Sequence, residues 1–130
     1  MGGVIAVVDD LFFVGKLEAT AKQTGVSLRT LRAVDFRLES LRTEKPALVL
    51  FDLNTTSASA VELIRQLKAD PELAGIPVVG FFSHVQAELQ RAAREAGCDE
   101  VMPRSKFAAG LAQLLQWYTV GGDTLPPKQE

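Results

Sequence analysis

The chain has 130 residues, the usual length of one domain and enough to bury a core without disulfides or a structural metal. Apolar residues make up 47% of it and charged residues 23%, as in ordinary globular proteins. The 14 basic and 16 acidic residues leave a net charge of -2 and form no basic block, so we expect no nucleic-acid partner. Cys98 is the single cysteine, which excludes an internal disulfide and disfavours a zinc site.

The N-terminus lacks the basic segment and the long apolar core of a signal peptide. No apolar run approaches the roughly 20 residues needed to cross a bilayer. We therefore expect a cytoplasmic protein with no membrane partner.

The first elements predicted along the chain are a strand, a helix and a weaker strand. Residues 4–8 are a continuous apolar run, typical of a strand buried on both faces. Residues 11–24 have a helical pattern that ends before Gly25, a residue suited to a left-handed cap. Residues 26–30 alternate apolar and polar side chains, which indicates a less buried or edge strand.

The middle of the chain repeats the same alternation. Residues 36–43 predict a helix with Asp35 as its N-cap. Residues 47–51 form a second buried strand, and residues 60–69 place apolar side chains on one face of a helix.

The last third adds two more pairs of elements. Residues 76–82 predict a strand, and residues 86–96 predict a helix that ends at Gly97. A short strand at 100–102 is followed by a helix at 106–118. Residues 119–130, with two glycines and two prolines, predict a flexible tail after a domain at 1–118.

Strand and helix thus alternate five times. This order predicts an α/β fold with a doubly wound, five-stranded parallel sheet flanked by five helices, joined by right-handed crossovers. Ligands of such sheets bind outside the carboxyl ends of the strands, so the polar residues there are candidates for function.

Aspartates follow two of these strands. Asp9 and Asp10 end the first strand, and Asp52 ends the third. If the strands are neighbours, the carboxylates converge, and packing like charges raises their pKa values unless a cation offsets the repulsion. A hard divalent ion, Mg²⁺ or Mn²⁺, is the simplest such cation. The alternative is that each aspartate caps the helix that follows it.

Basic residues follow the fifth strand. Arg104 or Lys106 could balance the acidic cluster or bind a transferred phosphoryl group. A solvated arginine on a loop is the alternative.

Four segments together resemble the successive landmarks of two-component response-regulator receiver domains, including the chemotaxis regulators: residues 7–10, 50–52, 76–79 and 96–99. The resemblance covers residues 4–117 and rests on the joint order of the segments. It implies a flavodoxin-like (receiver) topology. It also implies that an aspartate at the end of the third strand accepts a phosphoryl group from a histidine kinase or phosphotransfer protein.

The resemblance assigns roles by position. Asp52 would be the phosphoryl acceptor, Asp10 a direct Mg²⁺ ligand, Asp9 a ligand acting through water, and the backbone carbonyl of Asn54 a further ligand. A carboxylate nucleophile with a metal to neutralise developing charge is sound chemistry for this transfer. The chain would then be a stand-alone receiver in a phosphorelay, acting through a downstream protein partner rather than as an enzyme.

The sequence also departs from the family pattern. Phe82 stands where receivers carry Ser or Thr, and Ser83, one residue later, is a possible hydroxyl substitute. Arg104 stands in the place of the family lysine, and Val101 in the place of an aromatic residue. The chain is thus an atypical receiver. The main alternative is a pseudo-receiver that serves as a phosphorylation-independent protein-docking module.

Two other readings are disfavoured. Residues 52–56 faintly resemble the nucleophile loop of haloacid-dehalogenase-type phosphatases, but Asn54 replaces the second aspartate and the chain is short for that family. A flavodoxin-like cofactor binder would need a Ser/Thr/Gly-rich phosphate loop after the first strand, which the sequence lacks.

Overall fold

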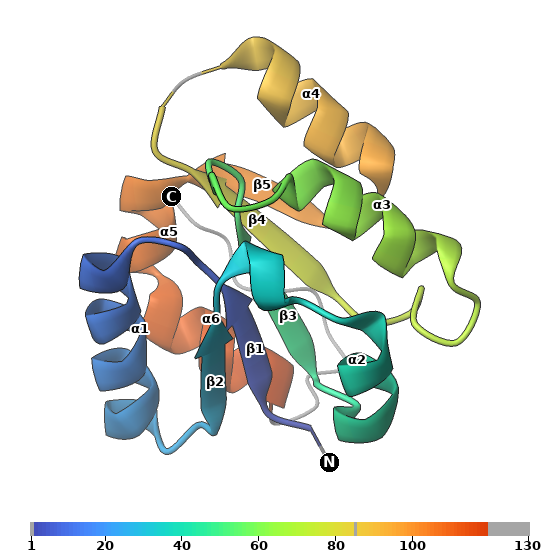
Figure 1. The fold of residues 1–130 in the computed structure, drawn as a ribbon. Coiled ribbons are helices and arrows are strands. Elements are labelled where there is room, and N and C mark those ends of the chain that lie inside the picture. The colour runs from blue at the N-terminus through green and yellow to red at the C-terminus, as the bar shows by residue number, and fades with distance from the viewer. Residues whose placement is uncertain (1, 85, 120–130) are drawn as a thin grey trace.

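Five parallel strands form the centre of the computed structural model, which describes residues 2–84 and 86–119 (Figure 1). The strands lie in the order β2-β1-β3-β4-β5, all paired in parallel. Their bounds are β1 Val4–Val7, β2 Leu28–Leu31, β3 Leu48–Asp52, β4 Val78–Phe82 and β5 Glu100–Pro103. The three central strands are buried along their whole length, whereas β2 is only partly buried. The predicted doubly wound sheet is confirmed.

Helices cover both faces of the sheet, as Figure 1 shows. One face carries α1 (Leu11–Thr24), α5 (Arg104–Ala109) and α6 (Leu111–Thr119), and the other α2 (Leu38–Glu44), α3 (Ala60–Ala69) and α4 (Ala87–Ala96). Because successive side chains of a strand point to opposite faces, Ile5 joins one core cluster and Ala6 the other.

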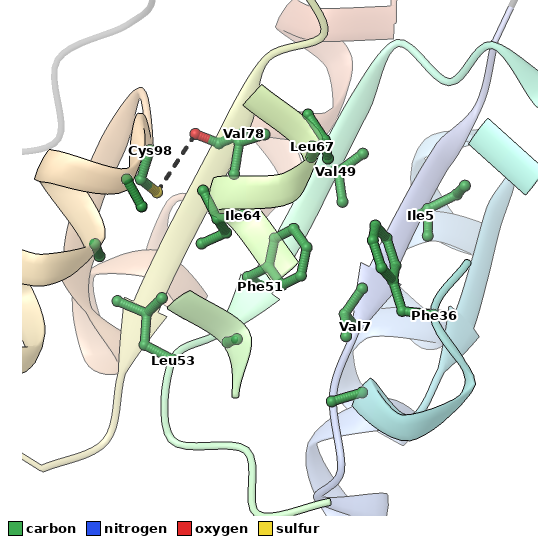
Figure 2. Close-up of a cluster of buried hydrophobic side chains, with 14 of the residues drawn as sticks. Ile5, Val7, Phe36, Val49, Phe51, Leu53, Ile64, Leu67, Val78 and Cys98 are labelled. Atoms are coloured by element: carbon green, nitrogen blue, oxygen red, sulfur yellow. Dashed lines mark hydrogen bonds between the residues drawn. The ribbon is translucent and has the colours of Figure 1, made fainter. Parts of the chain in front are cut away.

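The two faces have aromatic side chains at their centres. Figure 2 shows the cluster under α2, α3 and α4, where Phe36 meets Phe51 edge to face with ring centroids 5.4 Å apart. On the opposite face, Phe81 and Phe107 stack with centroids 4.3 Å apart, and Phe13 lies 5.1 Å from Phe81. Each buried ring removes a large apolar area from water, and paired rings add a smaller specific attraction.

The helix caps agree with the sequence at two glycines. Gly25 ends α1 with φ 73° and Gly97 ends α4 with φ 110°, a left-handed conformation that a side chain disfavours. The bounds of α1 and α3 are those predicted from periodicity.

The prediction that Asp35 is the N-cap of the second helix is wrong. Residues Ala33–Asp35 form a separate 3₁₀ turn, η1, and α2 begins only at Leu38. Between them Phe36 is extended (φ -69°, ψ 131°) and buries its ring against Phe51. Burying that ring requires the chain to straighten where a continuous helix was expected.

The expected five helices are six α-helices in the described residues, because the last predicted helix is divided. Gly110 separates α5 from α6, and α5 begins at Arg104, before the predicted start. Glycine weakens a helix interior, and the break leaves both Phe107 and Leu111 buried against the sheet. The predicted tail, 119–130, lies outside the described residues except for Thr119, the last residue of α6.

No helix among residues 2–84 and 86–119 combines the length and apolar character needed to span a membrane.

Candidate functional site

The aspartates that follow β1 and end β3 meet at the carboxyl edge of the sheet. Pairing of Val7 with Phe51 aligns the ends of these neighbouring strands. Asp9 and Asp10 each influence the pKa of Asp52, which reflects their proximity. The predicted convergence at this edge therefore holds.

Asp52 is the one buried charged residue in the described part of the chain, with 5% of its surface exposed. Its Oδ1 accepts a hydrogen bond from the backbone N–H of Asn54 at 2.9 Å. Burial raises the pKa of the Asp52 carboxyl, while that hydrogen bond and the charge of Arg104 lower it and the two other aspartates raise it. No other described residue donates to this carboxylate, and none of the buried side-chain oxygens described lacks a partner, so Oδ2 keeps some exposure to solvent. We call the side of the site that this oxygen reaches its open side.

Both carboxylate oxygens of Asp10 accept hydrogen bonds. Its Oδ1 accepts the backbone N–H groups of Phe12 and Phe13 at 3.0 and 3.3 Å and so caps α1. Its Oδ2 accepts from Nη2 of Arg104 at 3.0 Å. The hydrogen bond from Arg104, together with the bonds from the helix terminus, outweighs desolvation and lowers the pKa of Asp10.

The carboxylate of Asp9 accepts hydrogen bonds from two segments, the turn after β2 and the loop after β3. Its carboxylate accepts the backbone N–H groups of Ala33, Thr56 and Ser57 and the hydroxyl of Ser57, at 2.8–3.0 Å. Burial by itself raises the pKa of this carboxyl, but the hydrogen bonds from Ser57, Ala33 and Thr56 outweigh it, and the pKa is lowered.

The sequence predicted that crowding raises these pKa values unless a cation offsets the repulsion. For Asp10, Arg104 and the hydrogen bonds from Phe12 and Phe13 outweigh desolvation, and for Asp9 the hydrogen bonds alone do so. The pKa of Asp52 is raised, with burial as the largest cause and the two neighbouring charges adding to it.

Arg104 is the cation of the site. Its guanidinium lies over the ring of Phe13, with Cζ 3.9 Å from the ring centroid, and bonds Asp10. Its Nη1 also donates to Oγ of Ser83 at 3.3 Å. Lys106, the other candidate, is exposed, and no described residue forms an ion pair with it.

Comparison with known proteins identifies the architecture. No family model and no curated protein matches the sequence. Among solved structures, the signal receiver domain of a signal transduction histidine kinase from Syntrophus aciditrophicus matches with a TM-score of 0.80 and 20% identity, covering 98% of each chain. The phosphorylated cyanobacterial phytochrome response regulator RcpA matches with a TM-score of 0.77 and 21% identity over 98% of this chain and 100% of its own. The Mn²⁺-bound form of response regulator Rcp1 matches with a TM-score of 0.75 and 21% identity over 95% and 98%.

The chain has the receiver fold. The family resemblance read from the sequence is thus confirmed at the level of the fold.

Within the receiver fold, the two sequence departures on β4 and β5 lie away from the open side of the site. Phe82 is 7% exposed and belongs to the core cluster under α3 and α4, together with Leu53 and Ala93. Val101 packs against the same cluster. Ser83 follows Phe82, and its hydroxyl contacts Arg104. Ser83, which the sequence named as a possible hydroxyl substitute, therefore has its hydroxyl within hydrogen-bond distance of the cation of the site.

The side chain of Asn54 connects two loops of the receiver fold, a role that the sequence did not reveal. Its Oδ1 accepts the backbone N–H of Ser83 at 2.7 Å, and its Nδ2 donates to Gln86 at 3.2 Å. Sequence reasoning considered only the carbonyl of Asn54, and it also missed Ser57 and Phe13. A small polar residue after a strand-end aspartate is a weak signal, because such residues are common in all loops.

Residues 2–84 and 86–119 contain no group of three or more His, Cys, Asp or Glu side chains placed to hold a metal ion. The carboxylate of Asp9 already accepts four hydrogen bonds, so Asp10 and Asp52 are the remaining carboxylates at this edge.

Proposed function

We propose that this chain is a response-regulator receiver that accepts a phosphoryl group on Asp52 in two-component phosphorelay signalling. The observation that carries the proposal is the buried carboxylate of Asp52, which has one oxygen held by Asn54 and the other on the open side of the site. A fixed carboxylate with a raised pKa and a cation nearby is a good candidate for a nucleophile.

The transfer takes place between a carboxylate oxygen and phosphorus. Oδ2 of Asp52 attacks the phosphorus of a phosphohistidine, a P–O bond forms, and the P–N bond breaks. The electron pair of the broken bond stays on the imidazole, which takes a proton from solvent. The aspartyl phosphate is dianionic. The guanidinium of Arg104, which bonds Asp10 and whose charge acts on Asp52, would bind its oxygens.

A divalent cation, Mg²⁺ or Mn²⁺, is part of this proposal. The oxygens that would hold it are those of Asp10 and Asp52, with the backbone carbonyl of Asn54. Mg²⁺ commonly keeps several waters and binds proteins through one or two carboxylates, so the donor set is sufficient although no third carboxylate joins it. When bound, the ion would neutralise charge that develops on the phosphoryl oxygens. A water-mediated role for Asp9 stays a prediction.

The partners of the proposed receiver are a histidine kinase or phosphotransfer protein as donor and a downstream protein as target. Support comes from the fold, which is that of the receiver domain of a histidine kinase and of response regulators. The cytoplasmic location and the stand-alone character of the chain stay predictions.

The mass of the intact protein tests the proposal. After treatment with a small phosphodonor and Mg²⁺, wild type should gain the mass of one phosphoryl group and Asp52→Asn should gain none. Asp35→Asn, which removes an exposed acid of η1, is the matched control and should react like wild type. Absence of any gain in wild type, with a known receiver reacting in parallel, would contradict the proposal and favour the pseudo-receiver.

A further inference from the structure

Three side chains hold Arg104. Its guanidinium lies over Phe13, with Cζ 3.9 Å from the ring centroid, and its two terminal nitrogens bond Asp10 and Ser83. Phe13 is itself fixed in the aromatic cluster with Phe81 and Phe107. A planar cation stacked on a fixed ring and bonded at both ends has little freedom to leave.

The consequence for Asp10 is that neither of its carboxylate oxygens is free of a partner. Oδ1 is shared between two N–H groups at the start of α1, and Oδ2 is bonded to Arg104. A metal ligand must direct a lone pair at the ion, and no cation other than Arg104 contacts Oδ2 among the described residues. Oδ1 already accepts two hydrogen bonds, so a metal ion would bind the remaining lone pair of Oδ2, beside the guanidinium, and the two cations would repel each other there.

We propose that Arg104 is an internal competitor of the divalent cation: the Arg104–Asp10 ion pair and metal binding to Asp10 oppose one another. This inference rests on the metal part of the proposed function. Both cations bind the same oxygen of Asp10, so the ion pair lowers the affinity of the site for the metal. By linkage, metal bound to Asp10 weakens the hold of Arg104 to the same extent.

The residue type explains why the competition is strong. Arginine keeps its charge at every accessible pH, so deprotonation of the guanidinium does not break the ion pair. Its planar group stacks on Phe13, which an ammonium on a flexible stem does less well. An arginine in this place is thus a more persistent competitor than a lysine.

Metal affinity measures the competition directly. Mn²⁺ is titrated into wild type, and the free ion is followed by its electron paramagnetic resonance signal. Arg104→Met, which keeps an unbranched side chain over Phe13 but removes the charge, should bind Mn²⁺ at least tenfold more tightly than wild type, about 1.4 kcal/mol. Lys106→Met removes an exposed charge from the same helix and should change the affinity by less than about twofold, because it does not contact Asp10.

Further variants locate the effect at the ion pair. Arg104→Lys should lie between wild type and Arg104→Met. Asp10→Asn combined with Arg104→Met should lose the gain, because the contested oxygen donor is altered. Equal affinities of wild type and Arg104→Met, or an equal gain in Lys106→Met, would overturn the inference.

A measurement on wild type alone keeps the test independent of how well the variants fold. On titration with Mg²⁺, the Nε–H signal of Arg104 and the ring signals of Phe13 should shift together with the amide of Asp10. Shifts at Asp10 without any change at Arg104 would contradict competition. The phosphoryl mass measurement on Asp52 is a separate readout, so phosphorylation can succeed or fail whatever the outcome at Arg104.

Discussion

Ser57 donates both its backbone N–H and its hydroxyl to the carboxylate of Asp9, at 2.8 and 3.0 Å, across 48 residues of sequence. The same carboxylate accepts from Thr56 and from Ala33 of η1. One side chain after β1 therefore fixes both the loop after β3 and the turn after β2. Asp9 thus positions the loop that begins at Asp52.

The first prediction is that Asp9→Ala destabilises the fold. Several N–H groups lose a charged acceptor, and each such bond contributes about 1.5–3 kcal/mol before water replaces part of it. Because the site is only partly buried, we expect the free energy of unfolding to fall by about 1–3 kcal/mol. Urea denaturation measures this, with Asp35→Ala as the control from the same region. Asp35 is exposed, and its removal should change stability by less than about 0.5 kcal/mol.

The second prediction concerns acid. The pKa values of Asp9 and Asp10 are lower in the folded chain than the ordinary value of about 4 for an unfolded aspartate. The unfolded state then binds more protons, so their contribution to stability is complete above about pH 4 and is lost as the pH falls through the folded values. Denaturation midpoints between about pH 2 and pH 6 should fall more steeply toward acid in wild type than in Asp9→Asn. Parallel curves would refute the role given to Asp9.

Much of the fold could be predicted from the sequence because buried strands and helices leave recognisable patterns of apolar residues. Strands β1, β3 and β4 are buried on both faces and therefore appear as continuous apolar runs. Gly25 and Gly97 marked helix ends because their left-handed conformation suits glycine. The failure at Asp35 has the opposite origin. Asp35 is a local capping signal, but the packing of Phe36 on the distant Phe51 determines the backbone there, and no local sequence pattern encodes that contact.

The sequence predicted which residues form the site better than it predicted the hydrogen bonds between them. The order of strands puts Asp10, Asp52 and Arg104 at one edge whatever their partners are. Which oxygen meets which donor depends on loops far apart in sequence, as in the hydrogen bonds from Ser83 to Asn54 and from Ser57 to Asp9. The lowered pKa values of Asp9 and Asp10 could therefore not be foreseen, because they depend on these hydrogen bonds and on Arg104.

A third prediction is that Asp52→Asn is more stable than wild type at neutral pH. Burial raises the pKa of Asp52, so this group favours the folded state below about pH 4 and loses that contribution as the pH rises through its folded value. The amide is isosteric and avoids the cost of a buried charge beside two others. We expect a melting temperature a few degrees higher than wild type at pH 7 and an equal one near pH 3. A lower melting temperature at pH 7 would make Asp52 a structural anchor instead.

The last prediction concerns Phe82, which the receiver resemblance assigns to the position of a hydroxyl residue and which is buried in the core under α3 and α4. A phosphoryl group shifts a conformation only through contacts that differ between two states, and this ring offers its oxygens no hydrogen bond. A stable phosphoryl mimic should therefore change amide chemical shifts around Asp52 and Ser83 and leave α4 little affected in wild type. Phe82→Thr should lose about 2–4 kcal/mol of stability through the vacated volume and should spread the changes into α4. Phe82→Leu, which restores apolar volume without a hydroxyl, separates the two effects: it should keep the changes local. Large shifts along α4 in wild type would contradict the prediction.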